Sequence, residues 1–351
     1  MTSKLEAFIR QSYPETAYPS LLAQCKKFRE TQALAGCKIL DATPVFRNTL
    51  VKYYALLSAG AHLTVSVGKD IPCDPDIVKI LPDFGISMEI KNQFFDAVAD
   101  CAGRHRNIQS RHGYVELTRS GLEYYGDCPQ PVISADTGLI KTFETVLGTG
   151  DGFVRAMRQL GYTDVAGKNI LIFGGGKVGL GIKYQLDKLG AETAVADIRF
   201  LTENISGHTY INANEPDTVR KYIRNAWCIV AATGLSGALA QWAGEFAASP
   251  ALIANMGVED EFSEALPETR VLNNKRPVNF ILDEPTQLRC IDPVMALSNY
   301  SLASLIHGKL SGGKGIYPPC PADENLVLQS VDKEFQDSKE ILKRILEGKR
   351  L

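Results

Sequence analysis

The chain has 351 residues, of which 45% are hydrophobic and 22% are charged, so it is long enough to bury a substantial core and to divide into two domains. A formal net charge of −2 gives no electrostatic reason to expect nucleic acid or an anionic membrane as a partner, which leaves a small-molecule substrate. No apolar run approaches membrane-spanning length, and the N-terminus does not begin a signal peptide, so we expect a cytoplasmic protein.

Strand and helix patterns alternate over residues 1–148 and predict an N-terminal α/β substrate domain. The apolar spacing indicates a helix over 46–58 and a strand over 63–67. A further helix is predicted over 92–102. This part of the chain therefore forms a domain of its own ahead of any cofactor-binding unit.

Two helical stretches follow, at 136–148 and 152–160, with a break predicted at Thr149-Gly150-Asp151. We expect them to connect the substrate domain to a second domain over 149–293. The remaining segment, 294–351, is expected to return to the first domain. A cleft between domains hinged in this way is a common place for a substrate.

An apolar run over 169–173 leads into a glycine turn and a helical pattern, which together predict a Rossmann-type dinucleotide-binding domain. Gly174 permits the tight turn, Gly176 lets a pyrophosphate approach the backbone, and Gly179 allows close packing of helix on strand. The predicted phosphate-binding turn comprises these residues: Gly174, Gly176, Lys177, Val178 and Gly179.

Asp197 closes the next apolar segment, where a carboxylate can accept hydrogen bonds from the adenosine ribose hydroxyls. A carboxylate also repels the 2′-phosphate of NADP, so we predict NAD as the cofactor. Arg199 keeps NADP as one alternative, and a glycine loop that holds no cofactor is another.

Eight cysteines and five histidines show no short paired spacing of the kind that metal sites or disulfide frameworks use. We expect most cysteines to be reduced, buried small side chains. No structural metal is predicted.

From about residue 136 onward, the order of motifs resembles S-adenosylhomocysteine hydrolases. The matching pieces are the helical segment that contains Phe143, the glycine turn and three later motifs: Val230-Ala231-Ala232-Thr233-Gly234, Ala254-Asn255-Met256-Gly257 and Ser298-Asn299. The resemblance implies a two-domain NAD enzyme in which a tightly held cofactor oxidises a sugar hydroxyl, making a neighbouring C–H acidic so that elimination can follow.

The later turns fall at the ends of predicted cofactor-domain strands, the edge at which this fold binds ligands. We therefore predict cofactor contacts from Thr233 and Gly234 and from the Asn255-Met256-Gly257 turn. The resemblance also implies that Thr118 and Ser120 reach NAD. The alternative for Asn and Thr in such turns is that they satisfy local backbone groups.

Departures from the family's motifs indicate a changed substrate. Val258 stands where the family has a catalytic histidine, and Leu117 stands where its glutamate holds the adenosine sugar. The His-Met-Thr element near the N-terminus is replaced by Pro44-Val45-Phe46. No Lys/Tyr tail follows the helix predicted over 331–346, so we expect a homodimer rather than an interlocked tetramer.

For proton transfer we predict Lys141 and Glu144, because a three-residue spacing places both on one face of a helix. In an ungapped pairing with the family, Glu144 stands at the aspartate, and Lys141 lies one residue beyond the lysine. The alternative is a surface ion pair. Asp136 and Glu116 are second candidates, with a helix cap or a solvated acid as their alternative roles.

A basic run precedes Glu116 and consists of Arg104, Arg106, Arg111 and His112. It is able to recognise a carboxylate or a phosphate, and a solvated loop is the alternative. Three functions follow from the sequence: an NAD-dependent enzyme that oxidises a hydroxyl of a sugar-like or other small metabolite, with or without elimination or hydrolysis; a true adenosylhomocysteine hydrolase; and a non-catalytic NAD-binding regulator.

Overall fold

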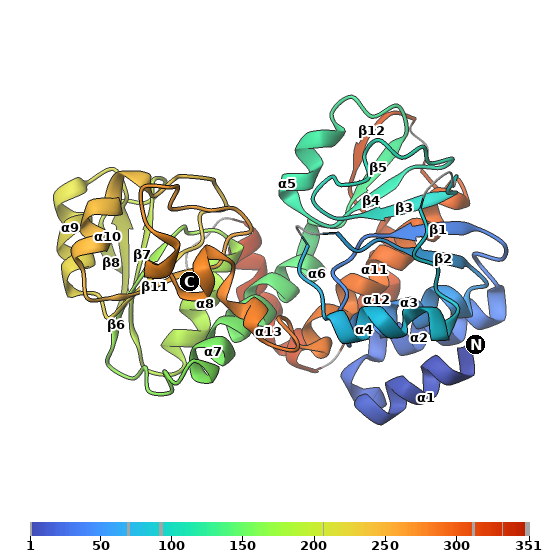
Figure 1. The fold of residues 1–351 in the computed structure, drawn as a ribbon, viewed down its shortest axis with the longest axis horizontal. Coiled ribbons are helices and arrows are strands. Elements are labelled where there is room, and N and C mark those ends of the chain that lie inside the picture. The colour runs from blue at the N-terminus through green and yellow to red at the C-terminus, as the bar shows by residue number, and fades with distance from the viewer. Residues whose placement is uncertain are drawn as a thin grey trace. The chain divides into compact units, whose positions relative to one another are not determined.

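The computed structural model describes residues 2–68, 71–90, 94–205, 207–310, 313–331 and 333–347. The chain divides into two compact units (Figure 1). Unit 1 comprises the chain up to Lys141 together with Gln287–Asp337, and unit 2 comprises Thr142–Thr286 together with the residues from Ser338 onward. The chain leaves unit 1 after Lys141 and returns to it after Thr286, so both crossings precede the boundaries expected at 148 and 293.

Unit 1 is built on a six-stranded sheet with the order β12-β5-β4-β3-β1-β2, in which every pairing is parallel. The strands are β1 (Lys38–Asp41), β2 (His62–Val65), β3 (Ala97–Asp100), β4 (Tyr114–Glu116), β5 (Pro131–Ser134) and β12 (Gly315–Tyr317). The strand order reverses between β1 and β3, as in doubly wound α/β domains, whose ligands bind beyond the carboxyl ends of the strands at such a reversal.

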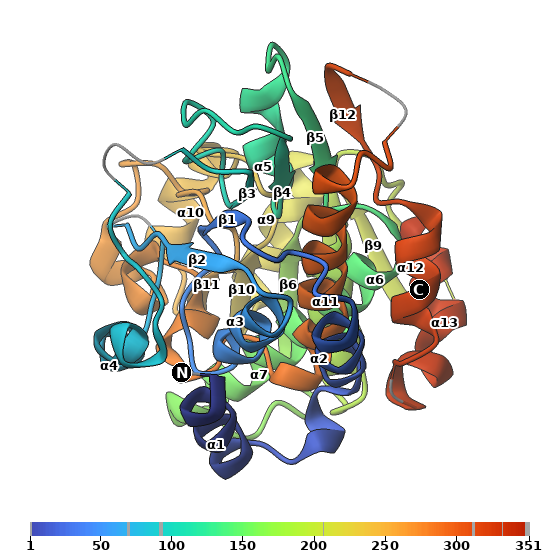
Figure 2. The ribbon, with the colours of Figure 1, turned by 90° about the vertical axis from the view of Figure 1, so that its right-hand side faces the viewer.

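The helices of unit 1 include two, α11 (Leu288–Ile306) and α12 (Pro321–Leu328), that come from the C-terminal part of the chain. The others are α1 (Thr2–Ser12), α2 (Pro19–Thr31), α3 (Thr49–Ser58), α4 (Pro75–Ile80) and α5 (Arg119–Leu122), with 3-10 turns at Glu15–Ala17, Leu81–Phe84 and Glu123–Tyr125. Helix α11 is buried along most of its length and packs on α2, α3 and β3 (Figure 2).

Polar contacts hold α11 in this position. The Asp292 carboxylate accepts the backbone N–H groups of Ser20 and Leu21, both at 2.8 Å, and so stabilises the N-terminus of α2. The amide of Asn299 donates to Gln24 Oε1 at 3.0 Å and to the Lys52 carbonyl at 3.2 Å. The C-terminal segment therefore completes the first unit rather than forming a domain of its own.

Unit 2 holds a second six-stranded sheet, with the order β11-β10-β6-β7-β9-β8. Its strands are β6 (Asn169–Phe173), β7 (Glu192–Asp197), β8 (Glu203–Ile205), β9 (His208–Asn212), β10 (Cys228–Ala231) and β11 (Leu252–Asn255). Only the β8–β9 pairing is antiparallel among the described strands of this sheet. The parallel strands follow the 3-2-1-4-5 order of dinucleotide-binding domains, so the predicted fold class is confirmed.

Of the helices of unit 2, α9 (Pro216–Asn225) and α10 (Ala243–Ala248) contribute side chains to the apolar core of its sheet. Unit 2 also contains α7 (Gly150–Gln159) and α8 (Lys177–Asp187), with 3-10 turns at Ala240–Trp242, Glu268–Arg270, Leu272–Lys275 and Val278–Ile281. Helix α13 (Lys333–Leu346) contains the division between Asp337 and Ser338.

Two local predictions were wrong. The helix predicted over 92–102 is strand β3, with residues 92 and 93 outside the described part of the chain. A short apolar run that is buried on both faces of a sheet has no alternation by which to tell it from a buried helix. The break predicted at residues 149–151 is also absent, because α6 (Gly138–Phe143), the π-helix η4 (Glu144–Thr149) and α7 follow one another directly.

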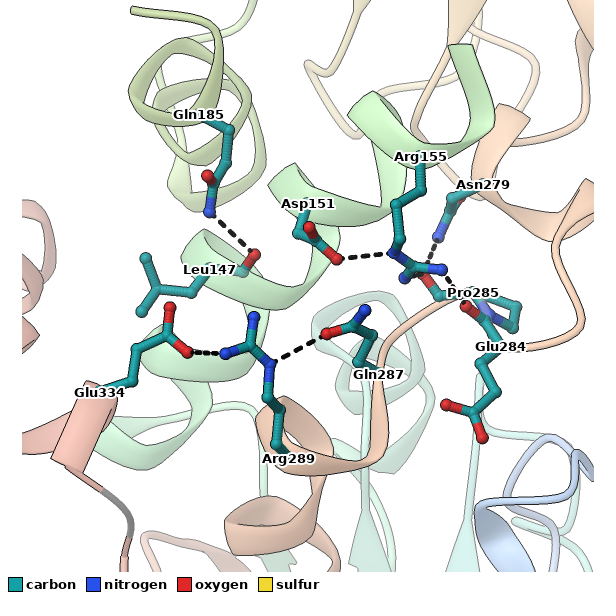
Figure 3. A network of polar contacts seen from close by, with 10 residues as sticks. All are labelled: Leu147, Asp151, Arg155, Gln185, Asn279, Glu284, Pro285, Gln287, Arg289 and Glu334. Carbon is teal, nitrogen blue, oxygen red and sulfur yellow. Dashed lines mark hydrogen bonds and ion pairs between the residues drawn. The ribbon is translucent and has the colours of Figure 1, made fainter. Parts of the chain in front are cut away.

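The second crossing lies between Thr286 and Gln287, and the segment on each side of it makes polar contacts within its own unit. In unit 2, the Arg155 side chain on α7 donates to Asp151 at 2.7 Å and to the carbonyl oxygens of Glu284 and Pro285 at 2.9 and 3.4 Å (Figure 3). In unit 1, Arg289 pairs with Glu334. The contacts of Arg155 with residues 284 and 285, and of Arg289 with Glu334, join positions far apart in the chain, so sequence spacing does not reveal them.

Gly181 allows close packing of α8 on η4 in unit 2, because a Cβ there would lie 2.4 Å from the carbonyl oxygen of Val146. We expect Gly181→Ala to lower the free energy of unfolding by about 1–3 kcal/mol, measured by urea denaturation of the full chain. Gly244→Ala in α10 is the control, because a Cβ there meets no atom within 4 Å, and stability should rise by about 0.5–1 kcal/mol. A Gly181→Ala variant as stable as the parent would contradict the close packing.

Candidate functional site

The glycine turn joins β6 to α8 at the carboxyl edge of the unit 2 sheet. Gly174 has a φ of +104°, and a Cβ there would lie 2.3 Å from the carbonyl oxygen of Ala232. A Cβ at Gly179 would lie 1.9 Å from the carbonyl oxygen of Gly174. The fold itself therefore requires glycine at both positions.

Gly176 differs from these two glycines, because a Cβ there would meet no protein atom within 4 Å and its φ is −82°. It is the N-cap of α8, makes no side-chain cap hydrogen bond, and is followed by Lys177 and Val178 in the first helical turn. A glycine at such an N-terminus lets an anion approach the backbone N–H groups closely. The residues present therefore fit the pyrophosphate of a dinucleotide.

Asp197 ends β7 and lies beside the glycine turn. One carboxylate oxygen accepts the Gly175 N–H at 2.7 Å, and the Arg199 guanidinium donates to both oxygens at 2.8 Å. Burial opposes ionisation, but the Arg199 side chain and the N–H groups of Arg199 and Gly175 together lower the pKa of Asp197. The acid is thus ionised and placed next to the predicted pyrophosphate site.

The turn after β10 is held by a glutamate that the sequence reasoning missed. The fully buried Glu261 carboxylate accepts the Thr233 N–H at 2.9 Å, the Thr233 hydroxyl at 2.7 Å and the Gly234 N–H at 2.8 Å. Burial raises the pKa of Glu261, although these hydrogen bonds oppose the rise. A Cβ at Gly257 would lie 2.2 Å from Glu261 Oε1, so this carboxylate fits between the turns after β10 and β11.

Asn255 ends β11, and its side chain is used within its own turn. The amide nitrogen donates to the carbonyls of Gly257, Glu259 and Lys275 at 3.1, 2.9 and 2.6 Å, and the amide oxygen accepts the Gly257 N–H at 3.1 Å. Met256, also predicted to contact the cofactor, is buried, and its N–H donates to the carbonyl of Ala231. The Asn255 side chain therefore satisfies backbone groups of its own turn, and a contact of this turn with the cofactor stays a prediction.

In unit 1, Asp100 and Glu116 end adjacent strands in register and are both fully buried. Glu116 accepts the N–H groups of Ala102, Gly103 and Thr118 at 3.0, 3.1 and 2.8 Å, and the Thr118 hydroxyl at 2.6 Å. Burial raises the pKa of Glu116. Its carboxylate holds two loops together, which is a structural use of a predicted catalytic acid.

Thr118 and Ser120 lie at α5. Thr118 is the N-cap of this helix, and its hydroxyl accepts the Gly121 N–H at 3.1 Å. Ser120 lies within α5 and is partly buried. Both belong to unit 1, and their contact with a cofactor stays a prediction.

The predicted proton-transfer residues lie where the chain leaves unit 1. Lys141 is the last residue of unit 1, in α6, and Glu144 is the buried first residue of η4. Helix α6 follows β5, so Lys141 comes shortly after the carboxyl end of that strand. Asp136 lies before α6. The catalytic roles of all three stay predictions.

Val258, at the position of the family's histidine, lies after the turn that follows β11 and is 69% exposed. Leu235, after the turn that follows β10, is 63% exposed. A hydrocarbon side chain cannot transfer a proton, so this edge of unit 2 lacks the group that the resemblance implies there.

Among the described residues, no group of three or more His, Cys, Asp or Glu side chains is arranged to hold a metal ion. The same part of the chain has no helix with the length and apolar character needed to cross a bilayer. The strand order of unit 2, the glycine turn and the acid at the end of β7 define a Rossmann-type α/β protein.

No family model matches the chain. It is 24% identical over 220 residues to an adenosylhomocysteinase of Sulfurisphaera tokodaii and 24% identical over 222 residues to that of Saccharolobus solfataricus. Each match covers 53% of this chain and 52% of the relative, so the chain spans about half the length of the curated relatives it matches. The resemblance seen in the motifs is thereby confirmed for about half of the chain.

A solved structure from Bacillus halodurans, one of the subunits of a dipicolinate synthase, matches with a TM-score of 0.50 and 13% identity. The match covers 78% of this chain and 99% of that one. At this identity the likeness shows the fold alone, and it agrees with the two sheets described above.

Glu261→Gln tests the glutamate that holds the turn after β10. An amide has only one acceptor oxygen, and its NH2 group would face the N–H and hydroxyl groups that now donate to the carboxylate. We therefore expect the free energy of unfolding to fall by about 2–3 kcal/mol. Urea denaturation measures this change. Glu259→Gln is the control, because Glu259 is exposed and its substitution should change stability by less than about 0.5 kcal/mol. Equal effects of the two substitutions would argue against the role of Glu261.

Proposed function

We propose that this protein is an NAD-dependent enzyme, a divergent relative of the adenosylhomocysteinases that oxidises a hydroxyl of a sugar-like or other small metabolite. One observation carries the proposal. Gly174 and Gly179 are required by the fold, but Gly176 has open space around its Cα and no conformational need for glycine. A ligand that approaches this backbone closely explains the residue.

NAD would be held by the turn Gly174 to Gly179, including Lys177 and Val178, with Asp197 accepting hydrogen bonds from the adenosine ribose. Thr233, Gly234 and the Asn255-Met256-Gly257 turn line the carboxyl ends of β10 and β11, where Glu261 fixes the first of these turns. When bound, NAD would accept hydride from the carbon that bears the substrate hydroxyl.

The chain must supply a group that accepts the hydroxyl proton. Lys141 is the first candidate, because α6 follows the carboxyl end of β5, at the edge where doubly wound sheets bind ligands. Glu116 is a weaker candidate than the sequence indicated, because its carboxylate already accepts four hydrogen bonds. Glu144 and Asp136 are the remaining candidates for the proton acceptor.

One experiment distinguishes the proposed function from two others. A true adenosylhomocysteine hydrolase requires compensation for Val258 and Leu117, and a non-catalytic NAD-binding regulator requires only the cofactor site. Purified protein with NAD is mixed with adenosine, adenosylhomocysteine and a panel of hydroxylated metabolites, and the absorbance band of reduced nicotinamide is followed. Reduction by a metabolite other than these two nucleosides supports the proposal. Reduction by the nucleosides favours the hydrolase, and NAD binding without any reduction favours the regulator.

Gly176→Ala tests the cofactor site without disturbing the fold. We expect NAD affinity to fall at least about tenfold, because the methyl group occupies the approach of the pyrophosphate. The free energy of unfolding should fall by no more than about 1 kcal/mol, the scale of an N-cap change, because the methyl group meets no protein atom. Calorimetric titration with NAD and urea denaturation measure the two quantities.

Gly179→Ala is the matched substitution, and its Cβ would lie 1.9 Å from a backbone oxygen. It should destabilise the protein by about 1–3 kcal/mol, whatever the turn binds. Undiminished NAD affinity in Gly176→Ala would overturn the assigned site.

Lys141→Met tests the proton-transfer role. We expect turnover of any substrate that reduces NAD to fall by about 100-fold or more, because general base catalysis contributes on this scale. NAD affinity should stay within about threefold of the parent value, because Lys141 is not among the residues assigned to the cofactor. Lys221→Met on α9, at an exposed position, is the control. Unchanged turnover in Lys141→Met would mean that another residue accepts the hydroxyl proton.

The homodimer and the cytoplasmic location stay predictions. Sedimentation of the full chain, with and without NAD, measures the first of these.

A further inference from the structure

Arg104 reaches across the carboxyl edge of the unit 1 sheet. It lies in the loop after β3, and its guanidinium packs against Gly68, which follows β2. A Cβ added at Gly68 would lie 1.6 Å from Arg104 Nη2 and 2.0 Å from Cζ. β1 lies between β2 and β3, so the side chain joins the two loops that flank the end of β1.

The loop that carries Arg104 is held by two buried carboxylates. Asp100 accepts the N–H groups of Cys101 and His105, both at 2.8 Å, and the Tyr125 hydroxyl at 2.6 Å. Glu116 accepts the next two N–H groups, those of Ala102 and Gly103. Ala102 and Gly103 both have left-handed φ values, 61° and 63°, which place successive N–H groups toward one carboxylate. The backbone of this loop is therefore preorganised.

The two neighbouring arginines of the basic run contact aromatic rings and polar groups. Arg106 lies over the Tyr124 ring at 4.7 Å and donates to the Gly103 carbonyl at 3.0 Å. Arg111 lies over the Phe94 ring at 5.4 Å and pairs with Asp96 at 3.2 Å. Of these three arginines, Arg104 is the one whose guanidinium lies over the strand ends.

The position of the guanidinium coincides with the reversal of strand order between β1 and β3, where sheets of this type bind ligands. The acid at the end of β1, Asp41, is fully buried and neutralised by the equally buried Lys52. A guanidinium recognises planar or tetrahedral oxyanions through paired N–H donors, which an ammonium group does not match.

We propose that unit 1 binds a carboxylate or phosphate group of the substrate through Arg104, at the end of β1. As a statement about the substrate, this inference rests on the proposed function, and it narrows the substrate to acidic hydroxylated metabolites. Adenosine carries no such group. The competing role for Arg104 is to balance the charges of Asp100 and Glu116, which predicts a loss of stability without any effect on anion binding.

The test uses the full chain and two probes, oxalate and inorganic phosphate, each titrated calorimetrically with and without NAD. The parent protein should bind one of them, and the tighter probe identifies a carboxylate or a phosphoryl site. We expect Arg104→Gln to weaken this binding at least about tenfold, the scale of a lost charge-assisted pair. Gly68→Ala should weaken it in the same direction with the arginine retained, because the methyl group displaces the guanidinium.

Arg111→Gln is the control and should leave anion affinity unchanged, because Arg111 is directed to Asp96. If Arg104→Gln does not fold, Arg104→Lys and Gly68→Ala carry the test, and Lys should restore only part of the affinity. Parent protein that binds neither probe would overturn the inference, as would unchanged affinity in Arg104→Gln accompanied by a lower melting temperature. NAD affinity, measured in the same samples, reports on the proposed function separately.

Discussion

Buried carboxylates that accept backbone N–H groups shape the loops at the strand ends in both units. Glu116 and Asp100 hold the loop after β3, and Glu261 holds the turn after β10. A carboxylate removed from water is costly unless several donors surround it, so each such group fixes the loop that supplies the donors. The shape of the loops at the carboxyl edges of the two sheets therefore depends on acids that face inward.

This constraint explains why acids read from the sequence as catalytic are difficult to assign. Glu116 has the residue type and the strand-end position that acid–base catalysis uses, and only its hydrogen bonds reveal a structural role. Glu261 was overlooked, because it lies outside every motif and acts on residues far away along the chain. Spacing in a sequence carries no information on such a contact.

The cofactor-binding unit was the more predictable part, because its signals are local. An apolar strand, a glycine turn and a helix follow one another between residues 169 and 187, and the structure places them as expected. In unit 1, β3 was mistaken for a helix, because its four buried residues carry no period. The position of Arg104 over the end of β1 also depends on strand order, which no local pattern contains.

The contrast among the three turn glycines has an evolutionary consequence. Gly174 and Gly179 are retained by any descendant that keeps the fold, whereas the fold alone accepts serine, asparagine or aspartate at the N-cap position Gly176. In a lineage that abandoned the ligand, Gly176 would drift to alanine, serine or larger residues while the other two stayed fixed. The identity of this one residue among related chains is thus a record of whether the turn is still in use.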